Sequence, residues 1–125
     1  MSDVTFDAGA LIAFERADRR VIAIVARALH HGDSIAVPAG VVGQVWRDGR
    51  RQARLARLLA SKPVEVEALD DEQARAAGQL CGARRTNDVI DACVARCARR
   101  RGGAVVTSDP GDIGHLDPTL RIIAI

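Results

Sequence analysis

The stretch VTFDAGALIA, residues 4–13, passes from strand-forming to helix-forming composition at one acidic residue. Val4-Thr5-Phe6 is β-branched and aromatic, as in a short buried strand, and Asp7 follows it directly. The residues after Asp7 are rich in alanine, which favours a helix. We therefore predict a strand that ends at Asp7 and a helix that starts immediately after it, the repeating unit of an α/β fold.

The same unit repeats along the rest of the chain. Apolar residues recur at helical spacing in some segments and form short β-prone runs in others, with glycine or proline between them. Asp70 is placed to cap one helix, and Asn87 or Thr86 another. The alternation predicts a three-layer α/β sandwich with a central, mostly parallel sheet flanked by helices. The predicted helices are 18–30, 38–46, 50–59, 70–81 and 88–100, with a helical turn after Pro110, and the later strands are 34–37, 64–67, 104–107 and 120–125.

Length and composition fit one globular domain over residues 1–125, since 48% of the residues are hydrophobic and 27% charged. No apolar run reaches the roughly 18–20 residues that cross a bilayer, and the acidic start Met1-Ser2-Asp3 is unlike a signal peptide. Cys81, Cys93 and Cys97 are an odd number without CxxC spacing, which is typical of a reducing compartment. We expect a cytoplasmic protein with no membrane contact.

Basic charge is carried almost entirely by arginine. Of 18 Lys and Arg residues only Lys62 is a lysine, and the formal net charge is +2. Arginine binds phosphates through a planar fork, which fits a nucleic-acid partner, although a genome-wide arginine and alanine bias would give the same composition. Four arginines near the predicted 38–46 and 88–100 helices are candidates for an RNA path, or for solvated helix faces: Arg47, Arg50, Arg84 and Arg85.

Aspartates gather where the predicted strands end. Asp7 follows the first strand, and Asp109 follows Val106-Thr107-Ser108. Because the carboxyl ends of parallel strands share one edge of the sheet, both should emerge on the same side. Asp88 and Asp91 are three residues apart at the start of a helix, so they point toward one face. Each acid could be a helix cap or a turn former, but their joint placement in apolar surroundings favours a shared site.

Such a cluster of acids has a chemical use. Carboxylates repel one another, and a hard divalent cation with oxygen ligands relieves the repulsion. Magnesium or manganese suits these ligands, and a metal held in this way can activate water and offset the charge that develops on a phosphodiester. The acids therefore predict metal-dependent hydrolysis of phosphodiester bonds without a covalent intermediate.

Four segments, in this order, resemble the PIN domain, in particular the VapC-type toxins of bacterial toxin–antitoxin pairs. They are TFDAGALIA (5–13), VP (37–38) before a helix, DVIDA (88–92) and VTSD (106–109), and together they extend over essentially the whole chain. The resemblance implies a central parallel sheet and a magnesium- or manganese-dependent endoribonuclease. It also implies a homodimer, and inhibition by a cognate antitoxin whose C-terminal segment blocks the metal site.

The resemblance also implies roles for individual residues. Asp7, Asp91 and Asp109 match the acidic metal ligands and catalytic residues of the family. Asp112 is a candidate auxiliary acid. Asp88, one turn before Asp91, could hold a metal-bound water or could merely cap its helix.

The chain departs from the family pattern at Gln44, where the family usually has a glutamate. A glutamine amide can bind a metal as a neutral ligand, or can donate a hydrogen bond to a residue that binds it. With glutamine in place of glutamate, the site has one negative charge fewer. We expect Gln44 to face the site, because its neighbours are apolar and a polar amide among them needs a partner. The loss of charge leaves an alternative function, a non-catalytic PIN-like module that binds RNA or antitoxin. A phospho-accepting domain is disfavoured because Lys62 lies in a predicted loop rather than at a strand end.

Base recognition has little support in the sequence. The aromatic residues are Phe6, Phe14 and Trp46, with no tyrosine, so a platform for base stacking is not predicted. We expect recognition of RNA through its shape and phosphates. Neither a P-loop nor a GxGxxG motif is present, so the sequence predicts no nucleotide cofactor.

Overall fold

A five-stranded sheet with the strand order β3-β2-β1-β4-β5 forms the centre of the computed structural model, and all neighbouring strands are parallel. The structure describes residues 3–125, so the expectation for Met1 and Ser2 lies outside the described residues. The predicted α/β sandwich is confirmed. The strands are β1 (Val4–Phe6), β2 (Ile35–Pro38), β3 (Val64–Glu67), β4 (Ala104–Thr107) and β5 (Ile122–Ala124); the helices are α1 (Ala8–Glu15), α2 (Arg19–His31), α3 (Ala39–Val45), α4 (Ala53–Ala60), α5 (Asp71–Arg84), α6 (Val89–Arg101) and α7 (Pro110–Leu116).

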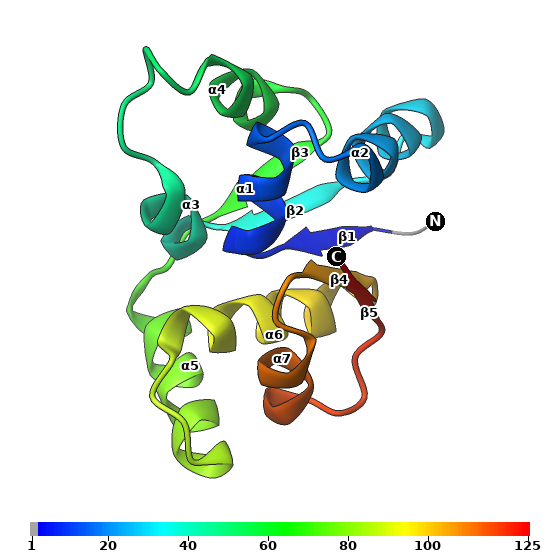
Figure 1. Ribbon diagram of the computed structural model, residues 1–125. Helices are drawn as coiled ribbons and strands as arrows, with labels where there is room; N and C mark the ends of the chain where they lie inside the picture. The colour runs from blue at the N-terminus through cyan, green and yellow to red at the C-terminus, as the bar shows by residue number, and fades with distance from the viewer. Residues whose placement is uncertain (1–2) are drawn as a thin grey trace.

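Helices cover both faces of this sheet (Figure 1). α1, α2 and α4 lie on one side of it, and α5, α6 and α7 lie on the other. β1, β2 and β4 are buried along their whole length, which explains why they are continuous apolar runs rather than alternating ones. The helices contribute one apolar face each, as α2 does with Val21, Val25 and Ala28.

The path of the chain reverses direction at the centre of the sheet. From β1 the chain moves to one side through β2 and β3, and then crosses to the opposite side of β1 for β4 and β5. The strand order therefore reverses between β1 and β4. In open parallel sheets, ligands bind beyond the carboxyl ends of the strands at such a reversal. Asp7 directly follows β1, and Asp109 is the second residue after β4.

The connection between α3 and α4 is longer than the sequence predicts, because α4 begins at Ala53 rather than at residue 50. The side chain of Gln52 stabilises this connection. Its Oε1 accepts the backbone N–H groups of Arg47 at 2.7 Å and Asp48 at 2.9 Å. The prediction missed this because a side chain that satisfies backbone groups leaves no periodic signal in the sequence.

The cap of α6 also differs from the prediction. Asp88, rather than Asn87 or Thr86, is the N-cap, and its Oδ1 accepts the Asp91 N–H at 2.9 Å. The prediction of Asp70 as the cap of α5 is confirmed, with a bond of 2.8 Å from the Gln73 N–H.

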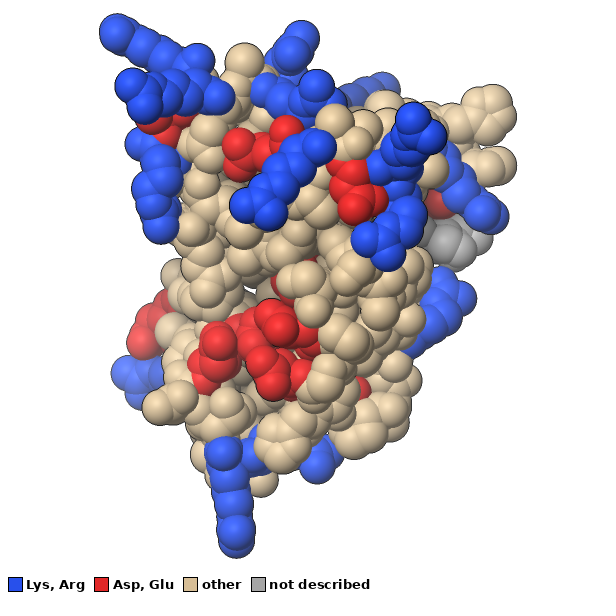
Figure 2. Space-filling model, viewed as in Figure 1, with Lys and Arg blue, Asp and Glu red and all other residues tan. Residues whose placement is uncertain are grey.

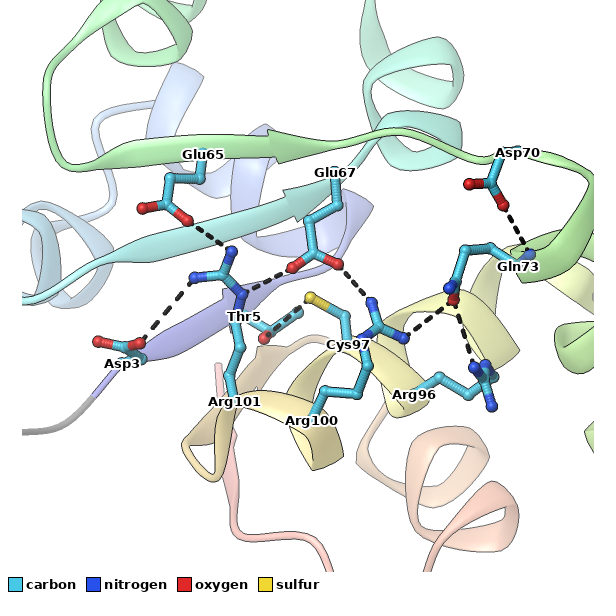
Figure 3. A network of polar contacts seen from close by, with 10 residues as sticks. All are labelled: Asp3, Thr5, Glu65, Glu67, Asp70, Gln73, Arg96, Cys97, Arg100 and Arg101. Carbon is cyan, nitrogen blue, oxygen red and sulfur yellow. Dashed lines mark hydrogen bonds and ion pairs between the residues drawn. The ribbon is translucent and has the colours of Figure 1, made fainter.

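Ion pairs join the edge strand β3 to the C-terminal turn of α6 (Figure 3). Arg101 donates to Glu65 at 2.6 Å and to Glu67 at 2.7 Å, and Arg100 also pairs with Glu67. The Arg101 side chain is only 18% exposed, so solvent screens these pairs less than ordinary surface pairs. The cluster ties the last turn of α6, whose first turn carries Asp91, to the edge of the sheet.

No helix within residues 3–125 combines the length and the apolar composition that a membrane span requires.

Candidate functional site

Asp7 lies at the end of β1 with its backbone still bonded to β4. Its N–H donates to the Val106 carbonyl at 3.3 Å, which continues the β1–β4 pairing by one residue. Its Oδ1 accepts the Ala10 N–H at 2.9 Å, the bond of a helix cap. The residue is 5% exposed. Asp7 is therefore both the cap of α1 and a buried acid at the carboxyl edge of the sheet.

Thr107, the last residue of β4, connects the two acids that follow the central strands. Its hydroxyl accepts the Asp109 N–H at 2.8 Å and donates to Oδ2 of Asp7. The Thr107 side chain is fully buried. Sequence reasoning did not assign Thr107 a role, although a hydroxyl residue at the end of the apolar run Ala104-Val105-Val106 was an available signal.

Asp7 lies in an environment that disfavours its negative charge. Burial raises the pKa of Asp7 above its ordinary value, and the carboxylate of Asp109 raises it further. The hydrogen bonds from Thr107 and Ala10 lower the pKa but do not cancel the effect of burial. Among the described residues no arginine or lysine forms an ion pair with Asp7. A cation bound beside it would stabilise the carboxylate.

The pKa of Asp91, in the first turn of α6, is also raised. Burial raises the pKa of Asp91 to about 7, and the carboxylates of Asp88, Asp112 and Asp7 contribute to the rise. Effects of this kind act over several ångströms, so the start of α6, the start of α7 and the end of β1 meet at one place.

The structure thus brings together the acids that the sequence placed at one edge of the sheet. They influence one another across β1, α6 and the segment from β4 into α7. Acidic side chains gather on one face of the molecule, next to a hollow (Figure 2). The members of this acid cluster are Asp7, Asp88, Asp91, Asp109 and Asp112.

The donors of the acid cluster fit a hard cation such as Mg²⁺ or Mn²⁺, because they are carboxylate oxygens that repel one another. Within residues 3–125, however, no three Asp, Glu, His or Cys side chains already lie in positions to hold an ion together. Asp7 and Asp88 are turned toward the backbone N–H groups that they cap. The residues fit the ion by chemistry and charge, and side-chain rotation would accompany its binding.

Gln44 lies on α3 and is exposed, so solvent can satisfy its amide, and its placement at the site stays a prediction. α3 approaches the start of α6, where Gly40 abuts the side chain of Ile90. Gln44 follows Gly40 by four residues and therefore shares its helix face. Gln44 therefore lies on the side of α3 that faces the start of α6 and is exposed, and Ile90 directly precedes Asp91 in the chain.

The predicted arginines are exposed and lie in two separate places. Arg47 caps the C-terminus of α3, since its guanidinium donates to the carbonyls of Gly43 at 3.1 Å and Trp46 at 2.7 Å. Arg50 lies in the α3–α4 connection. Lys and Arg side chains gather over α4 and this connection, above the hollow beside the acids (Figure 2).

Arg84 and Arg85 lie where α5 ends, apart from Arg47 and Arg50. Arg84 is the last residue of α5, and Arg85 is its C-cap in the left-handed conformation with φ of 56°. The ring of His115 contacts the Arg84 carbonyl at 2.5 Å, which joins α7 to this turn. Both arginine side chains are exposed and stay predictions as RNA contacts.

Comparisons with known proteins identify a family and a shared fold. A family model described as the PIN domain matches residues 4–116. VapBC2 from Rickettsia felis, bound to a DNA fragment from their promoter, shares the fold with a TM-score of 0.70 and 14% identity over 98% of both chains. A toxin–antitoxin complex from Klebsiella pneumoniae has a TM-score of 0.68 and 15% sequence identity, over 97% of this chain and 96% of that chain.

A third solved structure, Mycobacterium tuberculosis VapC20, is described as a Sarcin-Ricin loop cleaving toxin. It gives a TM-score of 0.59 and 20% identity over 87% of this chain and 92% of that chain. The curated proteins contain no match. At these identities the likeness to solved structures shows a shared fold.

Proposed function

The chain belongs to the PIN-domain family, and from that premise we propose that it is a metal-dependent endoribonuclease, the toxin of a toxin–antitoxin pair. One observation carries the proposal. Burial, together with the carboxylates of acids from three separate segments, raises the pKa values of Asp7 and Asp91 beyond the carboxyl ends of β1 and β4. Such an arrangement costs stability unless a ligand compensates, and perturbed acids in a cleft mark functional sites.

Each acid has a proposed role. Asp7, Asp91 and Asp109 would hold Mg²⁺ or Mn²⁺, which when bound supplies positive charge against the phosphodiester as it is cleaved. Asp88 and Asp112 would orient water by accepting its hydrogen bonds. Four arginines would contact the RNA backbone: Arg47, Arg50, Arg84 and Arg85.

The partner we propose is an antitoxin protein that covers the acid cluster. Support comes from the Klebsiella pneumoniae neighbour, which is described as a toxin–antitoxin complex. We also propose a homodimer, in line with the family resemblance.

The test is cleavage of total RNA by the purified protein with Mg²⁺, with Mn²⁺ and with a chelator. The proposal predicts discrete fragments that form with metal and disappear with chelator, because random degradation by a contaminant would give a smear. Intact RNA under all three conditions, from folded protein, would contradict it.

A non-catalytic module is the second candidate, and the observation that favours it is the neutral amide of Gln44 on the side of α3 that faces α6. Such a module would bind RNA or antitoxin with the same surface but would not cut. Metal-independent RNA binding together with intact RNA in the presence of Mg²⁺ would identify it.

A further inference from the structure

Trp46 is a large aromatic residue that is not buried in the hydrophobic core. It is 38% exposed, whereas Phe6 and Leu11 are fully buried. Its ring rests on Gly49, where an added Cβ would lie 2.9 Å from Cζ2 of the indole. The backbone of Gly49 therefore supports one part of the ring, and 38% of the residue stays exposed to solvent.

The connection that carries Trp46 is held by specific hydrogen bonds. Besides accepting the two N–H groups described above, Gln52 donates through Nε2 to the Val45 carbonyl at 2.8 Å and to Glu15 Oε1 at 3.0 Å. Arg47 adds the bond to the Trp46 carbonyl. All of these bonds leave the indole free, so the connection presents the ring without depending on it. A ring held in place beforehand loses little conformational entropy when a ligand stacks on it.

The charges in the segment that follows Trp46 are mostly of one sign. The segment 47–62 contains six Lys and Arg residues and one acid, Asp48. Solvated helix faces usually mix the two signs, whereas a field of a single sign attracts oppositely charged ligands. Asp48 accepts the backbone N–H of Arg50 at 3.0 Å, and its nearest guanidinium contact is to Arg51 at 3.9 Å. The basic residues are Arg47, Arg50, Arg51, Arg54, Arg57 and Lys62.

α3 fixes where this ring lies relative to the acid cluster. Its first turn abuts α6 through Gly40 and Ile90, next to Asp91, and Trp46 follows its last residue. Seven helical residues span about 10 Å, roughly the rise of three stacked nucleotides. An RNA strand with a phosphate at the acids can therefore place a base about three nucleotides away at Trp46.

We propose that Trp46 is a base-stacking residue of this protein, which takes an unpaired nucleotide about three positions along the RNA strand from the phosphate at the acid cluster. The inference rests on the proposed function for the identity of the ligand. It assigns to the α3–α4 connection an aromatic face that binds a base and arginines that bind the flanking phosphates, the combination by which proteins bind single-stranded RNA. It also revises the expectation from the sequence that recognition depends on shape and phosphates alone.

The chain offers a direct readout, because Trp46 is its only tryptophan and tyrosine is absent. The experiment titrates the protein, in chelator, with single-stranded RNA oligonucleotides of random sequence and with an RNA duplex of the same length. We expect the single strands to quench Trp46 emission to saturation, and the duplex to quench it less. Binding measured separately by anisotropy of labelled single-stranded RNA should weaken about 5- to 150-fold in Trp46→Ala and change little in Trp46→Phe.

The matched control is Leu29→Ala, since Leu29 is an exposed apolar residue on α2, with 55% exposure, outside the α3–α4 connection. It should leave RNA affinity unchanged. RNA that binds without quenching, or equally to wild type and Trp46→Ala, would overturn the inference. So would an emission that changes with protein concentration rather than with RNA, because a second copy of the chain would then cover Trp46.

Failure of this inference and failure of the nuclease proposal can be told apart. Metal-dependent cleavage by a protein whose Trp46 is not quenched by RNA would refute only the stacking role. Quenching by single-stranded RNA without cleavage in Mg²⁺ would refute only the nuclease.

Discussion

At the scale of single residues, the hydroxyl of Thr107 couples the acids on the two central strands. It accepts the Asp109 N–H and donates to Asp7, so it fixes the orientation of a carboxylate that we propose as a ligand. Residues that orient metal ligands in this way typically contribute 10–100-fold to metal affinity or activity.

Thr107→Val keeps the shape of the side chain and removes the hydroxyl. We expect cleavage of RNA to fall about 10- to 100-fold and the free energy of unfolding to fall by about 1–3 kcal/mol, because Asp7 loses a buried donor. Thr107→Ser restores the donor and should recover most of the activity. Equal cleavage rates in wild type and Thr107→Val would remove Thr107 from the site.

The pKa of Asp91 makes a prediction for stability against pH. Its pKa is raised by burial and by neighbouring acids from 3.8 to about 7. A group whose pKa is higher in the folded state stabilises the fold when protonated. Its contribution is therefore fully present below about pH 4 and is lost as the pH rises through about 7.

Asp91→Asn stays neutral and should avoid this loss. We expect the variant to be more stable than wild type at about pH 8 by on the order of 1–2 kcal/mol, less than the full shift would give because solvent partly screens the carboxylate. Thermal unfolding in chelator across the pH range measures this. Added Mg²⁺ should raise the melting temperature of wild type more than that of the variant. Parallel pH profiles of the two proteins would contradict the account.

Gln44 tests the charge of the site. Gln44→Glu adds a carboxylate on the side of α3 that faces the start of α6, so we expect tighter Mg²⁺ binding, about tenfold for a gain of 1.4 kcal/mol. Isothermal titration calorimetry measures the affinity directly. The control is Gln79→Glu, which adds the same charge at an exposed position on α5. If both variants bind Mg²⁺ like wild type, Gln44 does not face the ion.

The sequence was informative about the acids and silent about the groups that orient them. Asp7 and Asp109 were predictable on one side of the molecule because the carboxyl ends of parallel strands share one edge of the sheet. The bond from Thr107 to Asp7 joins residues 100 positions apart, which no local pattern reports. The exposure of Trp46 was not predictable, because counting aromatic residues does not tell which of them the core leaves exposed.

At the scale of elements, the site depends on how closely α1 approaches the end of β4. Gly9, in the first turn of α1, faces Ser108, and a Cβ at this position would collide with the Ser108 side chain. Ser108 lies between Thr107 and Asp109 in the chain, so a shift here would displace both groups.

Gly9→Ala should therefore disturb the site. We expect a loss of about 1–3 kcal/mol in the free energy of unfolding from overpacking, together with weaker Mg²⁺ binding. Gly78→Ala is the control, because Gly78 lies in α5 with open space around its Cα and should gain about 0.5–1 kcal/mol from helix propensity. Chemical denaturation compares the two. A stabilised Gly9→Ala protein would show that α1 does not need this close approach.

The elements themselves were largely readable from the sequence. The buried strands β1, β2 and β4 are short apolar runs between turn residues, and α2 and α4 bury one face each. The start of α4 was wrong because Gln52 holds the preceding residues by side-chain bonds. The ion pairs beneath β3 were not predicted, since Arg101 and Glu67 are 34 residues apart.

At the scale of the whole molecule, charge is unevenly distributed over one face, and some acids also lie among the Lys and Arg side chains of its upper part (Figure 2). Acidic side chains gather next to the hollow, and Lys and Arg side chains extend over α4 and the α3–α4 connection above it. A polyanion attracted to the basic region would bring a phosphate toward the acids only if a cation neutralises them. The layout therefore predicts that RNA reaches the basic region without metal, and that a phosphate reaches the acids only when a cation is bound there.

The most direct test of the account measures the rate of RNA cleavage against Mg²⁺ concentration for wild type and for Asp7→Asn, Asp91→Asn and Asp109→Asn. Circular dichroism confirms that each variant is folded, and Asp71→Asn, an exposed acid on α5 that pairs only with Arg75 among the described residues, is the control. The account predicts saturable Mg²⁺-dependent cleavage by wild type and the control, and loss of cleavage in each of the three folded variants. Cleavage that persists in these variants, or that proceeds in chelator, would contradict it.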